Sequence, residues 1–146
     1  MPASRVLLAR LDRAEARADT AALRDTLRWY GPVERFAPLA AHPDTGIRQE
    51  LARAVARWST PGADPPAGDA DGEVRLSVAE AAAHRRTRAA DLLLAALGRD
   101  PSPAVREAAV EGLVACGTPA AAAVLSLLAD DPDASVRTAV ALLTEE

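Results

Sequence analysis

Four regularly spaced arginines are the residues of this sequence whose types and spacing most clearly could do chemistry. Each follows a Val or Ile and comes shortly after a turn rich in Asp and Pro. Their guanidinium groups could form an anion-binding stripe, because the planar fork of arginine binds carboxylates and phosphates through paired hydrogen bonds. They could instead bind turn aspartates of their own or a neighbouring repeat, as regular stacking requires. We favour this structural ladder, whose members are Arg48, Arg75, Arg106, Arg137, Asp44, Asp71 and Asp133.

The predicted helices that begin at these arginines carry a second set of candidate side chains. Offsets of two, six and ten residues from the preceding Val or Ile advance by four, so they form one strip on the solvent side. The strip changes from basic to acidic along the chain, and it is the best candidate surface for a protein partner. An ordinary solvated helix face has the same pattern. Together with Trp58, which continues the core face or anchors a partner, the candidate contacts are Gln49, Arg53, Arg57, Trp58, Glu80, His84, Glu107 and Glu111.

The densest basic stretch is His84-Arg85-Arg86-Thr87-Arg88. We place it at the end of one helix and the start of the next, where the helix dipole favours cations at the C-terminus. As a nucleic-acid site it is short and lacks interleaved aromatic residues. A structural role is therefore the favoured interpretation.

No motif in the sequence indicates catalysis or metal binding. His42 and His84 are the only histidines, and Cys116 is the only cysteine, so a usual zinc site cannot be assembled. Cys116 itself reads as a small buried core residue. No nucleophile motif, phosphate-binding loop or dinucleotide fingerprint is present. We therefore predict no cofactor, no metal and no enzymatic activity.

The elements that must position these residues form an internal repeat. Each repeat consists of a turn, a Val-Arg or Ile-Arg pair and an alanine-rich amphipathic run. The repeats recur at spacings of 27, 31 and 31 residues, measured between the four arginines. Apolar residues at offsets of four, seven and eight from each Val or Ile trace one helix face. A residue composition rich in Ala and poor in aromatic residues favours helices over strands. The sequence thus predicts an all-α protein.

Residues 1–146 are predicted to form one α-solenoid domain. Residues 1–31 are a helical cap, with helices expected over 4–18 and 20–30. Repeat 1 covers 32–58, and repeat 2 covers 59–86. In repeat 2 the density of Pro and Gly over 59–70 predicts a surface loop in place of the first helix. Repeats 3 and 4 cover 87–117 and 118–146.

Charge is distributed unevenly between the two halves. Residues 1–60 hold 10 Arg and 7 acidic residues, whereas residues 61–146 hold 7 Arg and 14 acidic residues, which together give the net charge of −4. The acidic second half argues against nucleic-acid binding. A single cysteine and the lack of a long apolar stretch predict a cytoplasmic protein without a membrane span.

The turns and the Val-Arg or Ile-Arg pairs resemble HEAT repeats, in particular the short bacterial kind called phycobilisome-lyase-type HEAT-like repeats. The residues that carry the resemblance are Pro43, Pro101, Pro132 and the turn aspartates, with the pairs at 47–48, 74–75, 105–106 and 136–137. The resemblance implies antiparallel helix pairs stacked into a right-handed α-solenoid, with the second helix of each pair on the concave face. It also implies that a protein partner is the commonest ligand.

Our leading hypothesis is a non-catalytic scaffold or adaptor that binds a protein partner on its concave face. The alternative is a HEAT-fold enzyme or accessory subunit acting on nucleic acid or a tetrapyrrole, in the manner of a DNA glycosylase or bilin lyase. Few aromatic residues are available to hold a base or a ring, which disfavours it. Homo- or hetero-oligomerisation through the C-terminal helix pair is a third possibility, since that pair has no obvious polar cap after it.

Overall fold

The computed structural model describes residues 9–10, 12–14, 17, 19–29, 34–58, 67–85 and 87–145, and in this part of the chain helices are joined by turns and no strand occurs. The helices fall into two compact units, Met1–Pro65 and Pro66–Glu146. The boundary lies inside the predicted loop at 59–70. Residues 67–70 of that loop form a turn and a bend, and the loop prediction for 59–66 concerns residues outside the described part.

The first unit contains α2 (Thr20–Trp29), the 3-10 helix η1 (Glu34–Ala41) and α3 (Thr45–Trp58). η1 is a 3-10 helix that contains Pro38, a residue that cannot donate a backbone hydrogen bond. α2 and η1 both pack on α3. Their contact buries a small core whose members are Ala14, Leu23, Leu39, Ile47 and Leu51. Most of the predicted helix over 4–18 lies outside the described residues, although 9–10 and 12–14 are helical.

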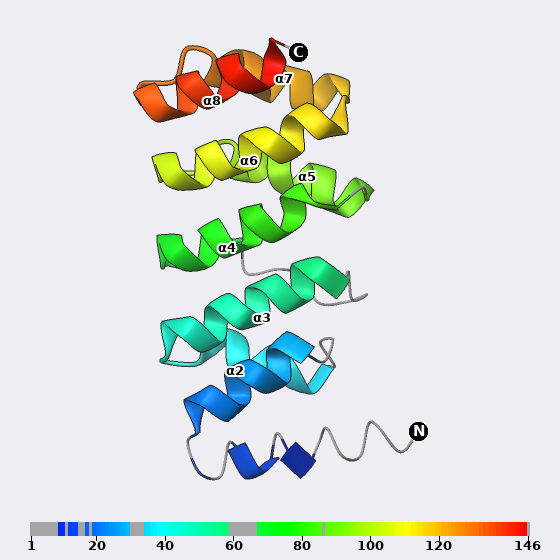
Figure 1. Ribbon diagram of the computed structural model, residues 1–146, viewed down its shortest axis with the longest axis vertical. Helices are drawn as coiled ribbons and strands as arrows, with labels where there is room; N and C mark the ends of the chain where they lie inside the picture. The colour runs from blue at the N-terminus through cyan, green and yellow to red at the C-terminus, as the bar shows by residue number, and fades with distance from the viewer. Residues whose placement is uncertain are drawn as a thin grey trace. The chain divides into compact units, whose positions relative to one another are not determined.

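The second unit contains α4 (Gly72–Ala83), α5 (Arg88–Leu97), α6 (Pro103–Cys116), α7 (Pro119–Leu128) and α8 (Ala134–Thr144). α4, α6 and α8 pack in that order, and α5 packs on α7, so the unit has two layers of helices (Figure 1). The layers meet through side chains that the 31-residue period places at equivalent positions. Val74, Val105 and Val136 are each fully buried.

The helix starts in this unit are fixed by short polar side chains. Asp71 and Asp133 accept hydrogen bonds from the backbone N–H of Glu73 and Ser135, while Thr87 and Thr118 accept from Ala90 and Ala121. Such caps satisfy N–H groups that have no partner inside the helix. α6 ends at Gly117, which has a φ of 62° and therefore adopts the left-handed conformation that glycine tolerates best.

Candidate binding surfaces

The ladder arginines of the second unit are held between two consecutive repeats. Nε and Nη2 of Arg75 donate to the two carboxylate oxygens of Asp100 at 2.7 and 3.1 Å, and Nη1 donates to the carbonyl of Asp69 at 2.7 Å. Arg106 repeats this arrangement with Asp131, at 2.8 Å for both side-chain bonds, and with the carbonyl of Asp100. Both guanidinium groups therefore direct their donors into the protein.

The bridging carboxylates are nearly buried, and their ionised forms are stabilised. Burial by itself would raise the pKa of Asp100, but the hydrogen bonds from Arg75 and from the Ser102 N–H outweigh it, so that the pKa is lowered. The hydrogen bonds from Arg106 are the main reason why the pKa of Asp131 is also lowered. The same pairs raise the pKa of Arg75 and Arg106.

The predicted ladder residues Asp71 and Asp133 lie at helix caps, whereas the bridging carboxylates belong to other residues of the turns. They cap α4 and α8, and the carboxylates that bind arginine across repeats are Asp100 and Asp131, two residues before a cap. Asp44 accepts from both the Ile47 N–H and the Arg24 guanidinium, and these bonds lower its pKa. The recurrence of Asp at 69, 100 and 131 is the sequence signal that could have identified the bridging residues, which the predicted ladder did not include.

The turn before α3 differs in one residue from the equivalent turns of the second unit. In three turns an Asp side chain accepts the backbone N–H two residues later, at 2.8–2.9 Å for Asp69, Asp100 and Asp131. At the equivalent position of the first unit, Nδ1 of His42 accepts the N–H of Asp44 at 3.0 Å. An imidazole nitrogen thus takes the place of a carboxylate oxygen there. Arg48 retains its bonds to the turn carbonyls of His42 and Pro43.

Arg137, like the other ladder arginines, donates to carbonyl oxygens of the turn that precedes it. These are the carbonyls of Asp131 and Pro132, at 2.6 and 3.0 Å. Arg137 is exposed, in contrast to the half-buried Arg75 and Arg106. On the outer side of α8, Ala141 and Thr144 stand where α6 has the fully buried Val110 and Leu113. Both residues are smaller than their counterparts in α6, and both are exposed.

The predicted partner strip is exposed in the second unit. Glu80, His84, Glu107 and Glu111 are all exposed, and no hydrogen bond or ion pair from the described residues reaches the three glutamates. Leu142 occupies in α8 the position that Glu80 and Glu111 occupy in α4 and α6, and it is 66% exposed. Leu142 was not among the predicted strip residues, although the 31-residue period leads directly to it.

In the first unit the strip has a different character. Gln49 is half-buried, and Arg53 donates to Glu50 at 3.2 Å, an (i, i+3) pair on α3 in which the glutamate is nearly buried. The side chains of Arg57 and Trp58 lie outside the described part of the structure. Cys116, predicted to be buried, is half-buried, and its thiol donates to a carboxylate oxygen of Asp91 at 2.9 Å.

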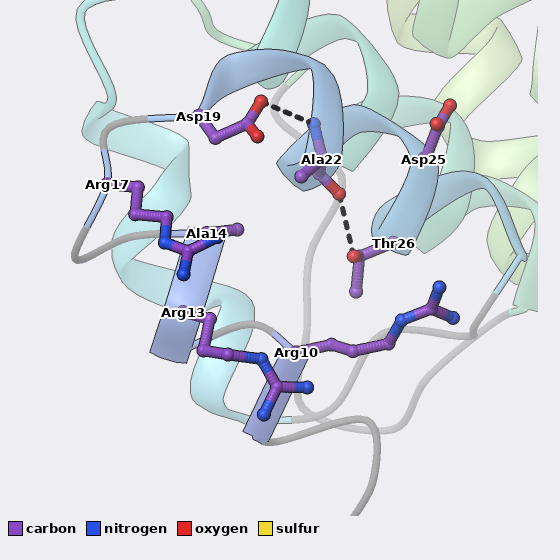
Figure 2. A pocket seen from close by; sticks show the side chains of 8 residues that line it. All are labelled: Arg10, Arg13, Ala14, Arg17, Asp19, Ala22, Asp25 and Thr26. Carbon is purple, nitrogen blue, oxygen red and sulfur yellow. Dashed lines mark hydrogen bonds between the residues drawn. The ribbon is translucent and has the colours of Figure 1, made fainter.

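A separate cavity lies in the first unit, between the segment 10–17 and α2 (Figure 2). Its volume is about 450 Å³. Three arginines from the segment line it, together with residues from α2 and from the position just before α2. The lining residues are Arg10, Arg13, Ala14, Arg17, Asp19, Ala22, Asp25 and Thr26.

Two features are absent from the part of the chain that the structure describes. Within this part, no group of three or more His, Cys, Asp and Glu side chains is arranged so that it could hold a metal ion. None of the helices in that part of the chain combines the length and the hydropathy that crossing a membrane demands.

Comparison with known proteins gives one family. The model for HEAT repeats matches residues 66–144, which is more than half of the chain and includes all of α4 to α8. No curated protein matches the sequence.

Proposed function

Because the chain belongs to the HEAT-repeat family, we propose that it is a non-catalytic scaffold or adaptor that binds a protein partner. We also place the partner on the concave face of a right-handed solenoid of antiparallel helix pairs, as in the phycobilisome-lyase-type members that the turns resemble. A surface that is already folded binds with a small loss of conformational entropy, which favours this use of a repeat array.

The observation that carries the proposal is the row formed by Glu80, Glu111 and Leu142 on α4, α6 and α8. The three residues are 31 positions apart and all are exposed. Neither glutamate has a partner among the described residues, and Glu107 adds a third carboxylate on the same side of α6. Since Arg75 and Arg106 are taken up by Asp100 and Asp131, they leave this acidic row uncompensated.

This arrangement favours a partner that carries basic side chains next to an apolar one. Exposed charges of this kind contribute more to the rate and specificity of association than to affinity. Leu142 would supply apolar contact area at one end of the row, where an anchor side chain has most effect when water is excluded from it. The single cysteine, which excludes an intrachain disulfide, supports a reducing compartment such as the cytoplasm.

Affinity capture from the native cell with the full chain tests the proposal. We expect a defined set of proteins to be recovered by the wild type and lost with Glu111→Arg, because reversing one charge repels a basic partner. Asp130→Arg is the matched control, as Asp130 is exposed on a turn and its side chain has no partner in the described structure. Recovery of the same proteins by a Glu80→Arg/Glu111→Arg variant would place the binding surface elsewhere.

A further inference from the structure

The cavity between the segment 10–17 and α2 has one wall that is strongly cationic. Arg10 and Arg13 are three residues apart, and Arg13 and Arg17 are four apart, so the three side chains lie on one side of this segment. The backbone N–H of Arg17 donates to the carbonyl of Arg13 at 3.2 Å, a hydrogen bond of the i to i−4 kind found in helices. Figure 2 shows all three side chains leaving this segment along the border of the cavity.

Two of these guanidinium groups are not used by the fold. Arg13 and Arg17 are exposed, and no side-chain hydrogen bond or ion pair reaches them from the described residues. Like charges at this spacing repel one another. The arrangement therefore has a cost in the free protein that an anion in the cavity would relieve.

The opposite wall does not neutralise the arginines. An oxygen of Asp19 is occupied by the N–H of Ala22 at 3.0 Å, where it caps α2, and Asp25 lies exposed at the border. The hydroxyl of the nearly buried Thr26 donates to the carbonyl of Ala22 at 2.7 Å, so it closes the cavity without offering its proton. The lining residues thus hold three cationic and two anionic side chains, one positive charge in excess.

From this geometry we propose that the cavity binds a small, multiply charged anion, with Arg13 and Arg17 as its main contacts. The ligand class is a compound with two or more adjacent phosphate groups, because paired guanidinium forks match phosphate oxygens. The volume of about 450 Å³ is within the range of small-molecule sites, roughly 300–1,000 Å³. This site lies in the first unit and is independent of the protein partner proposed for α4, α6 and α8.

Calorimetric titration of the full chain with pyrophosphate, in low-salt buffer without other polyanions, tests the site. We expect saturable binding with one site per chain. The double variant Arg13→Gln/Arg17→Gln should weaken it by at least about tenfold, the loss expected for charge-assisted hydrogen bonds. The control Arg88→Gln/Arg99→Gln removes the same charge from exposed arginines of the second unit and should bind as the wild type does. Asp25→Asn should bind more tightly, because it removes a carboxylate from the border.

Three outcomes would overturn the proposal. One is the absence of saturable binding at millimolar pyrophosphate. Another is an equal loss in both double variants, since that would mean attraction to the overall charge of the chain and no binding in the cavity. A third is a short nucleic acid that binds through Arg13 and Arg17 while pyrophosphate does not, which would make the arginines a polymer-binding surface. Circular dichroism of each variant establishes that it is folded.

Discussion

Asp131 receives two hydrogen bonds of 2.8 Å from Arg106, a residue 25 positions earlier in the preceding repeat. The side chain of Asp131 is only 5% exposed, and the arginine is 12% exposed. At such a site the net worth of an ion pair depends on the balance between desolvation and attraction. Removing one partner, however, leaves the other nearly buried and unpaired.

We therefore expect Asp131→Asn to lower the free energy of unfolding by about 2–3 kcal/mol. The substitution keeps the shape of the side chain and removes its charge, so Arg106 loses a carboxylate that accepts both of its donors. Urea denaturation followed by circular dichroism measures the change. Asp130→Asn serves as the control, because this neighbouring carboxylate is exposed and should change stability by less than about 0.5 kcal/mol. Equal effects of the two variants would contradict the structural role of the pair.

The same pairs predict how stability depends on pH. Asp100 and Asp131 have pKa values below the ordinary value of a carboxyl group, so the folded state binds their protons less readily than the unfolded state. Their contribution is present in full above the pKa of the unfolded chain, about 3.9, and is lost as the pH falls through the folded values. In the wild type these two groups should leave the denaturation midpoint unchanged from neutral pH down to about pH 4 and make it decline steeply below that pH. The decline should be shallower in Asp131→Asn, and an unchanged slope would argue against this linkage.

Gly112 is predicted to tolerate no larger residue at the centre of α6. A Cβ added there would lie 2.5 Å from a methyl group of Leu94 and 2.9 Å from the Cα of Ala83. The backbone atom cannot move aside as a side chain can. Although alanine gains about 1 kcal/mol in helix propensity over glycine, we expect Gly112→Ala to destabilise the protein by about 1–3 kcal/mol. Thermal unfolding measures this, with Gly72→Ala as the control, since its nearest neighbour is 3.6 Å away.

His42 offers a test of the turn that departs from the repeat pattern. Its Nδ1 accepts the N–H of Asp44, so His42→Ala should leave that amide without its partner and speed its hydrogen exchange. The cost should be about 1 kcal/mol for a partly buried bond of this kind. His42→Asp places the residue type of the other turns at this position and should keep the amide protected. Amide exchange monitored by NMR distinguishes the two variants, and equal protection in both would mean that the imidazole has no capping role.

Much of the architecture could be predicted from the sequence because it depends on local signals. The pair Val105-Arg106 and the turn before it, repeated at Val136-Arg137, fix the helix starts and the period. Helix α5 and helix α7 follow from Thr caps and a clear apolar face. These features require no knowledge of distant contacts.

The sites were harder to predict because they depend on which repeat supplies each partner. Asp71 and Asp100 both lie in turns before an arginine, yet one caps a helix and the other crosses to the preceding repeat. The bond from Cys116 to Asp91 joins residues 25 apart and has no sequence motif. The cavity beside Arg13 and Arg17 arises from the approach of two segments, which periodicity alone does not reveal.

The fixed step between arginine and carboxylate limits how such a chain can change in length during evolution. Arg75 to Asp100 and Arg106 to Asp131 are both steps of 25 residues, and Asp100 and Asp131 are 31 residues apart. Loss or duplication of a whole 31-residue segment would present each arginine with an equivalent carboxylate, whereas a gain or loss of another length between them would separate the pair. We therefore expect changes in repeat number to be tolerated in whole units. Smaller insertions should be tolerated in loops that do not lie between an arginine and its carboxylate.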